Sequence, residues 1–168
     1  MNTTFQRTAA SDEWFTPKEI IEALGVFDLD PCAAHGWLTA SSHLYKEDDG
    51  LAHKWWGRVW LNPPYSRRLI SPFIHKMAEH GDGIALIFNR MDITLWHDVI
   101  FPTATAMLVM RDRLKFYRPD GTQGESAGCG SVLVAWGEYN AEALINSNIH
   151  GKFFRINPDN TKIQPHQS

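Results

Sequence analysis

The spacing of apolar side chains changes along the chain between a period of about two and a period near 3.6, which predicts alternating strands and helices. A continuous apolar run at 84–89 is typical of a strand whose two faces are both covered. Other short apolar runs predict strands, and helical patterns separate them; the strands are at 26–30, 58–62 and 106–110, and the helices at 16–25, from 71 onward and at 92–101. This alternation predicts an α/β fold with a mostly parallel sheet.

The first predicted helix carries signals at both of its ends. Thr16 is expected to be the N-cap, Pro17 suits the first helical position, and Glu19 completes a capping box. Gly25 is expected to end the helix.

The second half of the chain predicts an antiparallel end to the sheet. Segments 113–119 and 131–137 have a strand-like composition, and a glycine-rich stretch separates them. We therefore expect these two segments to pair with each other as antiparallel strands. A short helix is expected at 140–148, and a last strand at 152–156.

Composition narrows the class of protein. The chain has 168 residues, 43% hydrophobic and 21% charged, which predicts a single globular domain at 13–156 between a flexible N-terminus at 1–12 and a polar tail at 157–168. The net charge of −3 excludes a global basic field, so a nucleic-acid partner would have to meet a local basic patch. No apolar run approaches the roughly 18 residues that span a bilayer, and we expect a soluble, cytoplasmic protein without membrane contact.

The cysteines do not indicate a metal site. Cys32 and His35 have a Cys-x-x-His spacing, but no second such pair accompanies them, so no zinc site is expected. Cys129 is the only other cysteine, which makes a reduced compartment the default expectation.

Polar residues follow two of the predicted strands at the point where each strand ends. Asp30 lies in "FDLDPCA" at the end of one strand, and Asn62 lies in "VWLNPPY" at the end of the next. Ligands of α/β sheets bind beyond the carboxyl ends of the strands, so we expect both residues to open into one crevice.

The segment Asn62-Pro63-Pro64-Tyr65 has the chemistry to activate an amine on a flat ring. The Asn62 side-chain oxygen and the Pro63 carbonyl can each accept one hydrogen of an –NH2 group, while Pro64 fixes the direction of that carbonyl. Two acceptors favour the form of the amine whose lone pair is localised, which stabilises the transition state. Tyr65 offers a ring on which a base that has left its duplex can stack. The alternative is a proline-rich turn in which Tyr65 packs against a helix.

The order of motifs along the chain resembles the phage-type (Dam-like) DNA adenine-N6 methyltransferase family over roughly residues 14 to 136. The motifs are, in order, "TP", "LDPCA", "EDDGL", "NPPY" and "RLKF". The resemblance implies a Rossmann-like fold, S-adenosylmethionine as the cofactor, and double-stranded DNA with a flipped adenine as the partner. It also implies direct methyl transfer without a covalent enzyme intermediate, in the cytoplasm of a bacterial host if the gene belongs to a phage or prophage.

The resemblance further implies a cofactor site. Asp30 is expected to meet the amino group of the cofactor, with a helix N-cap as the alternative role. Asp49, with Asp48 second, is expected to accept hydrogen bonds from the ribose or the adenine amine of the cofactor, with solvated loop charges as the alternative. The full expected set is Phe15, Thr16, Pro17, Asp30, Pro31, Cys32, Ala33, Asp48, Asp49, Leu51 and Asn62.

Basic residues are expected to contact DNA phosphates, which gives affinity without reading the sequence. They are Arg67, Arg68, Arg111, Arg113 and Lys115, and a solvated charged strand edge is the alternative for them. Target recognition would come from loops such as 121–130 or from the segment after Tyr65.

Two other functions remain open from the sequence. The Asn-Pro-Pro-Tyr motif also occurs in enzymes that methylate RNA or protein glutamine, so an RNA adenine or a glutamine side chain is the alternative substrate. The further alternative is an inactive nucleic-acid-binding module, for which paired acceptors would have no use.

Overall fold

The computed structural model describes residues 14–157 of the chain, except for the side chains of Arg67 and Ser126. The expected flexible N-terminus at 1–12 lies outside the described residues, as does the expected polar tail apart from its first residue, Asn157.

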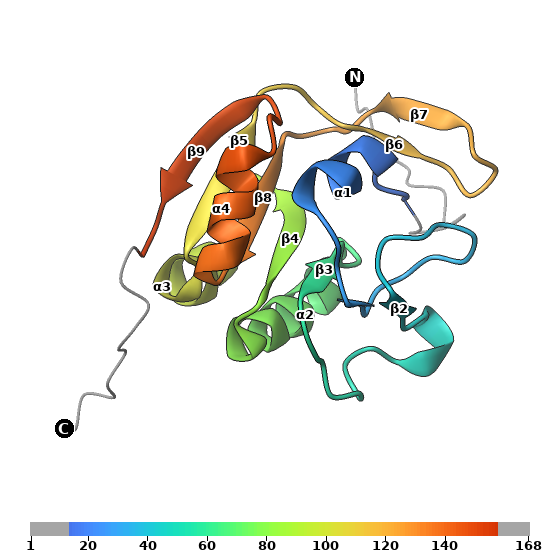
Figure 1. The fold of residues 1–168 in the computed structure, drawn as a ribbon, viewed down its shortest axis with the longest axis horizontal. Coiled ribbons are helices and arrows are strands. Elements are labelled where there is room, and N and C mark those ends of the chain that lie inside the picture. The colour runs from blue at the N-terminus through green and yellow to red at the C-terminus, as the bar shows by residue number, and fades with distance from the viewer. Residues whose placement is uncertain (1–13, 158–168) are drawn as a thin grey trace, which may run out of the picture.

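A seven-stranded mixed sheet forms the centre of the described chain, in the order β2-β1-β3-β4-β8-β5-β9 (Figure 1). The pairs β1–β2, β1–β3 and β3–β4 are parallel, whereas β8 is antiparallel to both β4 and β5, and β9 is antiparallel to β5. The strands are β1 (Leu29–Asp30), β2 (Ser42–His43), β3 (Val59–Leu61), β4 (Gly83–Phe88), β5 (Ala106–Met110), β8 (Ser131–Trp136) and β9 (Gly151–Arg155). The predicted α/β class with an antiparallel end is therefore confirmed.

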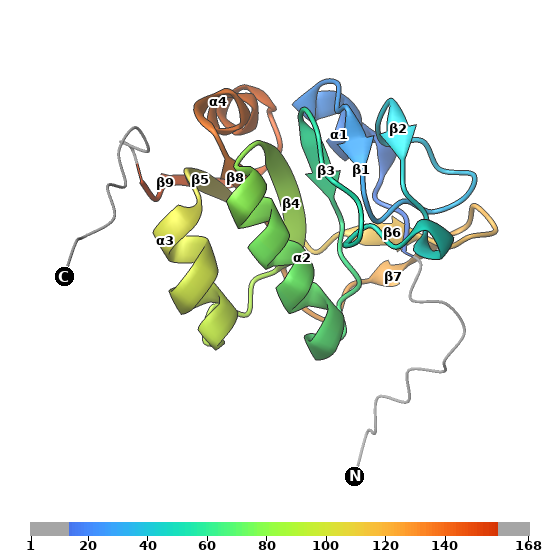
Figure 2. The same ribbon diagram turned by 90° about the horizontal axis from the view of Figure 1, so that it is seen from below.

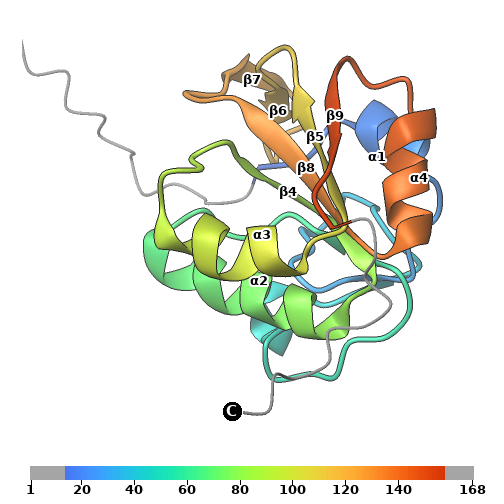
Figure 3. The same ribbon diagram turned by 90° about the vertical axis from the view of Figure 1, so that its left-hand side faces the viewer.

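Helices cover both faces of this sheet (Figures 2 and 3). The helix α2 (Arg67–His80) and the helical segment η2 (Trp96–Ile100) with α3 (Phe101–Thr103) lie on one face, and α1 (Lys18–Leu24) and α4 (Glu138–Asn146) lie on the other. A short 3-10 helix, η1 (Lys46–Asp48), precedes β3. In the described part of the chain, no helix is long and apolar enough to cross a membrane.

Strand β4 explains the continuous apolar run of the sequence. Ala85 and Ile87 belong to the core beneath α2, whereas Ile84 and Leu86 belong to the core beneath α1 and α4. Successive side chains of a strand point to opposite faces, so a strand with two helical layers must be apolar at every position.

The predicted pairing of 113–119 with 131–137 is wrong. The strand β6 (Lys115–Tyr117) pairs instead with β7 (Gln123–Ser126), a strand inside the glycine-rich stretch that the sequence did not indicate. The two form a hairpin outside the main sheet, while β8 inserts between β4 and β5. All six residues of β8 are buried, so this strand needs a partner on each side, and apolar alternation does not specify which partner that is.

The start of helix α2 also differs from the expectation. Helix α2 begins at Arg67 rather than at Ser71, and Pro72 lies inside the helix. The apolar face with Phe73, Ile74 and Met77 is as predicted and packs into the core, so tertiary packing outweighs the loss of one backbone donor at the proline.

Candidate active site

The two polar strand ends lie on neighbouring parallel strands. Strands β1 and β3 run parallel and side by side, with Leu29 opposite Val59, so Asp30 and Asn62 both lie at the carboxyl ends of neighbouring strands. The segment before α1 reaches the same place, because the Nδ2 group of Asn62 donates to the Trp14 carbonyl. The β6–β7 hairpin is attached to this segment by two backbone hydrogen bonds of 2.9 Å between Phe15 and Tyr117.

Every polar atom of the Asn62 side chain has a partner. Its Nδ2 donates to the Trp14 carbonyl at 3.1 Å and to Thr16 Oγ1 at 3.2 Å. Its Oδ1 accepts a hydrogen bond of 2.6 Å from the Tyr65 hydroxyl. An amide oxygen has two lone pairs, so Oδ1 retains the capacity to accept one further hydrogen.

Tyr65 is held against strand β4. Its hydroxyl lies 3.0 Å from the Leu86 carbonyl, and its ring stacks on Phe88 with ring centroids 4.2 Å apart. Burial raises the pKa of the phenol well above its usual value, and the nearby Cys129 and Cys32 thiols raise it further. Tyr65 is therefore a neutral hydrogen-bond donor with one ring face already covered.

The two prolines continue directly from Asn62. Pro63 is buried and Pro64 is half-buried, and no peptide bond in the described chain is cis. The exposed Arg68 follows on the first turn of α2, and Arg67 begins that helix.

Asp30 is a buried carboxylate, 3% exposed. The backbone N–H of Cys32 donates to its Oδ1 at 2.9 Å, and the Thr39 hydroxyl donates to its Oδ2. Burial raises the pKa of Asp30 to about 6, although both hydrogen bonds oppose this shift. A turn and not a helix follows Asp30, so the alternative role as a helix N-cap is wrong.

The two residues after Pro31 have small, neutral side chains. Burial and the neighbouring Asp30 raise the pKa of the Cys32 thiol well above its usual value, so Cys32 stays protonated. Ala33 is buried, and its N–H donates to the Leu44 carbonyl at 3.0 Å. The residues that follow Asp30 are therefore small and carry no charge.

The acidic loop before β3 packs directly onto the Asp30 loop. A Cβ atom at Gly50 would lie only 2.1 Å from the Pro31 carbonyl oxygen, so no larger residue fits between the two loops. Asp48 and Asp49 are exposed, and their carboxylates accept local N–H groups, from Tyr45 at 2.8 Å and from Leu51 at 3.2 Å. The structure thus brings the two expected cofactor loops together.

Thr16 does not have its predicted role as a helix cap. Pro17 occupies the N-cap position of α1, and no side-chain capping hydrogen bond is present there, so the capping box with Glu19 is wrong. The Thr16 hydroxyl contacts Asn62 instead, and its carbonyl accepts a 2.8 Å hydrogen bond from Trp37 Nε1. The Trp37 ring stacks on Phe15 with centroids 5.1 Å apart.

Several residues of the site were not identified from the sequence. They are Trp14, Trp37, Thr39, Leu86 and Phe88. Two of them act through backbone carbonyls, which leave no signature in the sequence, and Trp37 was one of seven tryptophans with no distinguishing pattern.

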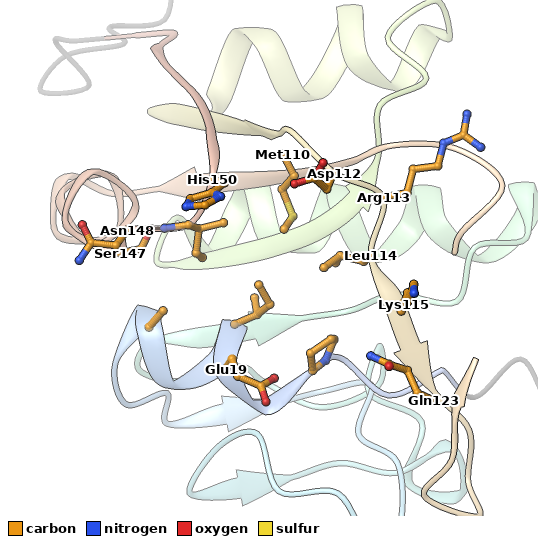
Figure 4. A pocket seen from close by; sticks show the side chains of 14 residues that line it. Glu19, Met110, Asp112, Arg113, Leu114, Lys115, Gln123, Ser147, Asn148 and His150 are labelled. Carbon is orange, nitrogen blue, oxygen red and sulfur yellow. Dashed lines mark hydrogen bonds between the residues drawn. The ribbon is translucent and has the colours of Figure 1, made fainter. Parts of the chain in front are cut away.

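A separate hollow of about 520 Å³ lies beside the site, between α1, the end of β5 and the loop before β9 (Figure 4). Pro17 lines this hollow, and the preceding residue, Thr16, contacts Asn62, so the segment before α1 lies between the hollow and Asn62. Arg113, Lys115 and His150 also line it, and an adjoining hollow of about 630 Å³ adds Arg111 and Lys152. Figure 4 shows Arg113 extending away from the hollow, and Glu19 and Asp112 add acidic groups to the lining.

The expected basic residues therefore form two groups and not one. Arg111, Arg113 and Lys115 lie by these hollows, near α1. Arg67 and Arg68 begin α2, which covers the opposite face of the sheet from α1 (Figure 3).

The sequence was compared with protein-family models, with characterised proteins and with solved structures. Residues 3–153 match the family model described as DNA N-6-adenine-methyltransferase (Dam). A DNA N-6-adenine-methyltransferase of Escherichia phage T1 is 35% identical over 98 residues, which covers 52% of this chain but only 40% of the length of that relative. No solved structure matches the chain significantly. Because the family model spans well over half of its length, the chain belongs to the Dam family of DNA N-6-adenine-methyltransferases.

Proposed function

We propose that this chain transfers a methyl group from S-adenosylmethionine to the N6 amine of adenine in double-stranded DNA. The proposed catalytic unit is one Rossmann-like methyltransferase domain over residues 13–156. Membership of the Dam family supports this activity, and the sheet supports the fold, because it has parallel strands in the order β2-β1-β3-β4 followed by antiparallel ones.

The observation that carries the proposal is the amide of Asn62. Both of its hydrogens are bound within the protein, whereas its oxygen accepts only from Tyr65 and keeps a second lone pair for a ligand. An acceptor oxygen at this position suits a substrate that brings –NH2 hydrogens. Together with the Pro63 carbonyl, it would hold the amine in the form whose lone pair attacks, which is stabilisation directed at the transition state.

The residues around Asp30 fit S-adenosylmethionine, which carries an ammonium group and a sulfonium group. A buried carboxylate with a raised pKa gains stability when a cation comes close, because the cation offsets the cost of burying the charge. We assign the ammonium side to Asp30, Pro31, Cys32 and Ala33, with Phe15, Pro17 and the backbone of Thr16 opposite. Asp48, Asp49 and Leu51 are assigned to the nucleoside, since exposed carboxylates accept hydrogen bonds from ribose hydroxyls. When bound, the cofactor supplies an electrophilic methyl group.

The protein itself then binds and orients the base. Asn62 and Pro63 accept the amine hydrogens, Pro64 fixes the Pro63 carbonyl, and the free face of Tyr65 stacks on the flipped base. No side chain needs to act as a nucleophile, and the protonated Cys32 thiol agrees with that. The proton that the amine loses after transfer goes to water, because the Tyr65 phenol is already protonated.

The DNA backbone would be contacted on both sides of this site. Arg67 and Arg68 follow the catalytic segment directly, while Arg111, Arg113 and Lys115 lie by the hollows next to α1. Such contacts supply affinity and position the duplex. The phage relative leads us to place the reaction in the cytoplasm of a bacterial host.

The test is incubation of the purified chain with methyl-labelled S-adenosylmethionine and separate samples of DNA, RNA and protein. Label in DNA that digests to N6-methyladenine supports the proposal. Label confined to RNA adenine or to glutamine would favour one of the alternative substrates, which are methylated by other enzymes that contain this motif. Absence of label with intact binding of DNA would favour an inactive binding module.

A further inference from the structure

We propose that Thr16 is a positioning residue for catalysis, because its hydroxyl, together with the Trp14 carbonyl, holds the Asn62 amide with the oxygen facing the substrate. This inference rests on the proposed function and goes beyond it, since it gives Thr16 a role other than cofactor binding. The 3.2 Å contact between Asn62 Nδ2 and Thr16 Oγ1 carries it.

An asparagine side chain has two ends of nearly equal size, and only its hydrogen-bond partners decide which end is which. If the Asn62 amide turned over, an –NH2 group would face the –NH2 group of the substrate, and two donors would oppose each other. The activity proposed for this site therefore depends on whatever holds the amide in one orientation.

Two groups hold the nitrogen end of Asn62. The Trp14 carbonyl can only accept, so it rejects an amide oxygen at its position, but Trp14 is 41% exposed and its contact with Asn62 is open to water. Thr16 is 2% exposed and binds the second hydrogen in a drier environment. A hydroxyl can donate as well as accept, so the acceptor-only Trp14 carbonyl decides which end of the amide is the nitrogen. One anchor leaves the amide free to swing about its Cβ–Cγ bond, and the second anchor, the Thr16 hydroxyl, fixes its plane.

Thr16 is itself rigidly placed for this task. Its carbonyl is held by Trp37 Nε1 at 2.8 Å, and the backbone bridge from Phe15 to Tyr117 adjoins it. Its hydroxyl makes no capping bond to α1, because Pro17 is the N-cap. The hydroxyl that looks like a helix cap in the sequence is therefore available to Asn62.

The experiment compares Thr16→Val, which keeps the shape and removes the hydroxyl, with Thr16→Ser, which keeps the hydroxyl. Thr105→Val is the matched control, since Thr105 is also 2% exposed and its hydroxyl also accepts an N–H, that of Gly137, at 2.9 Å. Thr105 precedes β5 at its amino end, away from the site.

In single-turnover assays with saturating cofactor, Thr16→Val should lower the rate of methyl transfer about ten- to hundredfold, the scale of a misplaced reacting group. Thr16→Ser should recover most of that rate, and Thr105→Val should keep it. The affinity for S-adenosylmethionine should be unchanged in all three. In the Asn62→Ala background, Thr16→Val should cause no further loss, because the two residues act as one unit.

A second measurement does not depend on activity. The side-chain amide protons of Asn62 are identified by their loss in Asn62→Ala, and the one bound by Thr16 should exchange slowly with solvent in nuclear magnetic resonance spectra. Thr16→Val should accelerate this exchange and Thr105→Val should not. If the protons respond as expected but no substrate is methylated, the proposed function fails, while the anchoring of Asn62 by Thr16 stands.

Other results would overturn the inference. Weakened cofactor binding in Thr16→Val, with an unchanged rate at saturation, would make Thr16 a cofactor ligand. Multiplicative losses in the double variant, or unchanged amide exchange in Thr16→Val, would show that Thr16 does not act through Asn62.

Discussion

The Tyr65 hydroxyl donates a 2.6 Å hydrogen bond to Asn62 Oδ1, the atom proposed to bind the target amine. The hydroxyl has one hydrogen and two acceptors within reach, because the Leu86 carbonyl lies 3.0 Å away. It can therefore turn toward Leu86 when an amine arrives, which frees Oδ1. Tyr65 thus keeps the Asn62 oxygen hydrogen-bonded in the absence of substrate, a contact that its expected role in stacking did not include.

Removing the Asn62 amide should affect the transition state and not cofactor binding. Asn62→Ala should lower the single-turnover rate on adenine-containing DNA by about 10² or more, the scale for losing one preorganised polar partner. Calorimetry should give nearly the parent affinity for S-adenosylmethionine. Asn146→Ala, an exposed position at the end of α4, serves as the control and should match the parent. A parent rate in Asn62→Ala would exclude the two-acceptor mechanism.

Substitutions at Tyr65 should separate its ring from its hydroxyl. Tyr65→Phe keeps the ring, so methyl transfer should stay within a few-fold of the parent, while the free energy of unfolding should fall by about 1 kcal/mol for the lost hydrogen bond. Tyr65→Ala should lose about 1–3 kcal/mol of stacking with the flipped base. Denaturant unfolding and single-turnover rates measure both effects. A large rate loss in Tyr65→Phe would mean that the hydroxyl takes part in catalysis.

The raised pKa of Asp30 predicts how cofactor binding depends on pH. Its pKa is about 6 in the fold against 3.8 for a free carboxyl, so below pH 6 the group is neutral and must lose a proton to bind a cation. Affinity for S-adenosylmethionine should therefore weaken as the pH falls below 6, by up to about tenfold per unit. Asp30→Asn should bind more weakly above pH 6 and lose this dependence. Calorimetry at several pH values measures this affinity. If Asp30→Asn and the parent showed the same dependence of affinity on pH, the assignment would be contradicted.

The same shift predicts a pH dependence of stability with the opposite sign to that of a salt-bridged acid. Between about pH 4 and 6 the folded protein holds a proton that the unfolded chain has released, so the free energy of unfolding falls as the pH rises. The total fall should be at most about 3 kcal/mol, since a pKa unit is worth about 1.4 kcal/mol. Asp30→Asn should remove it. The comparison with the parent also separates the contribution of Asp30 to the pH dependence of stability from that of His43, whose pKa is lowered by burial.

Salt dependence should identify the basic residues that meet DNA. Charge reversal of Arg111, Arg113 and Lys115 together should weaken DNA binding and reduce the slope of log affinity against log salt by about one unit for each lost phosphate contact. Arg67→Glu with Arg68→Glu should act similarly and separately. Lys54→Glu, at an exposed position before β3, is the control. A group whose reversal leaves the slope unchanged faces solvent and not DNA.

Local patterns in the sequence were sufficient for the strands β3, β4 and β5 and for the placement of Asp30 and Asn62 at the ends of neighbouring strands. The apolar run at 84–89 required cover on both faces, and strand–helix alternation required parallel strands whose carboxyl ends lie together. The strands at 106–110 and 84–89 accordingly appear within a residue of the expected bounds. Each of these features depends on residues close together along the chain.

Only the tertiary structure decided which strands pair and which side chains bond when the partners are distant in the sequence. The sequence marked 113–119 and 131–137 as strands, but burial on both sides placed 131–136 between β4 and β5 and left 115–117 to pair with an unpredicted strand. Thr16 has every local feature of a helix cap, yet its hydroxyl contacts Asn62, 46 residues away. A hydroxyl bonds to whichever group packing brings within about 3 Å, and no local pattern encodes that choice.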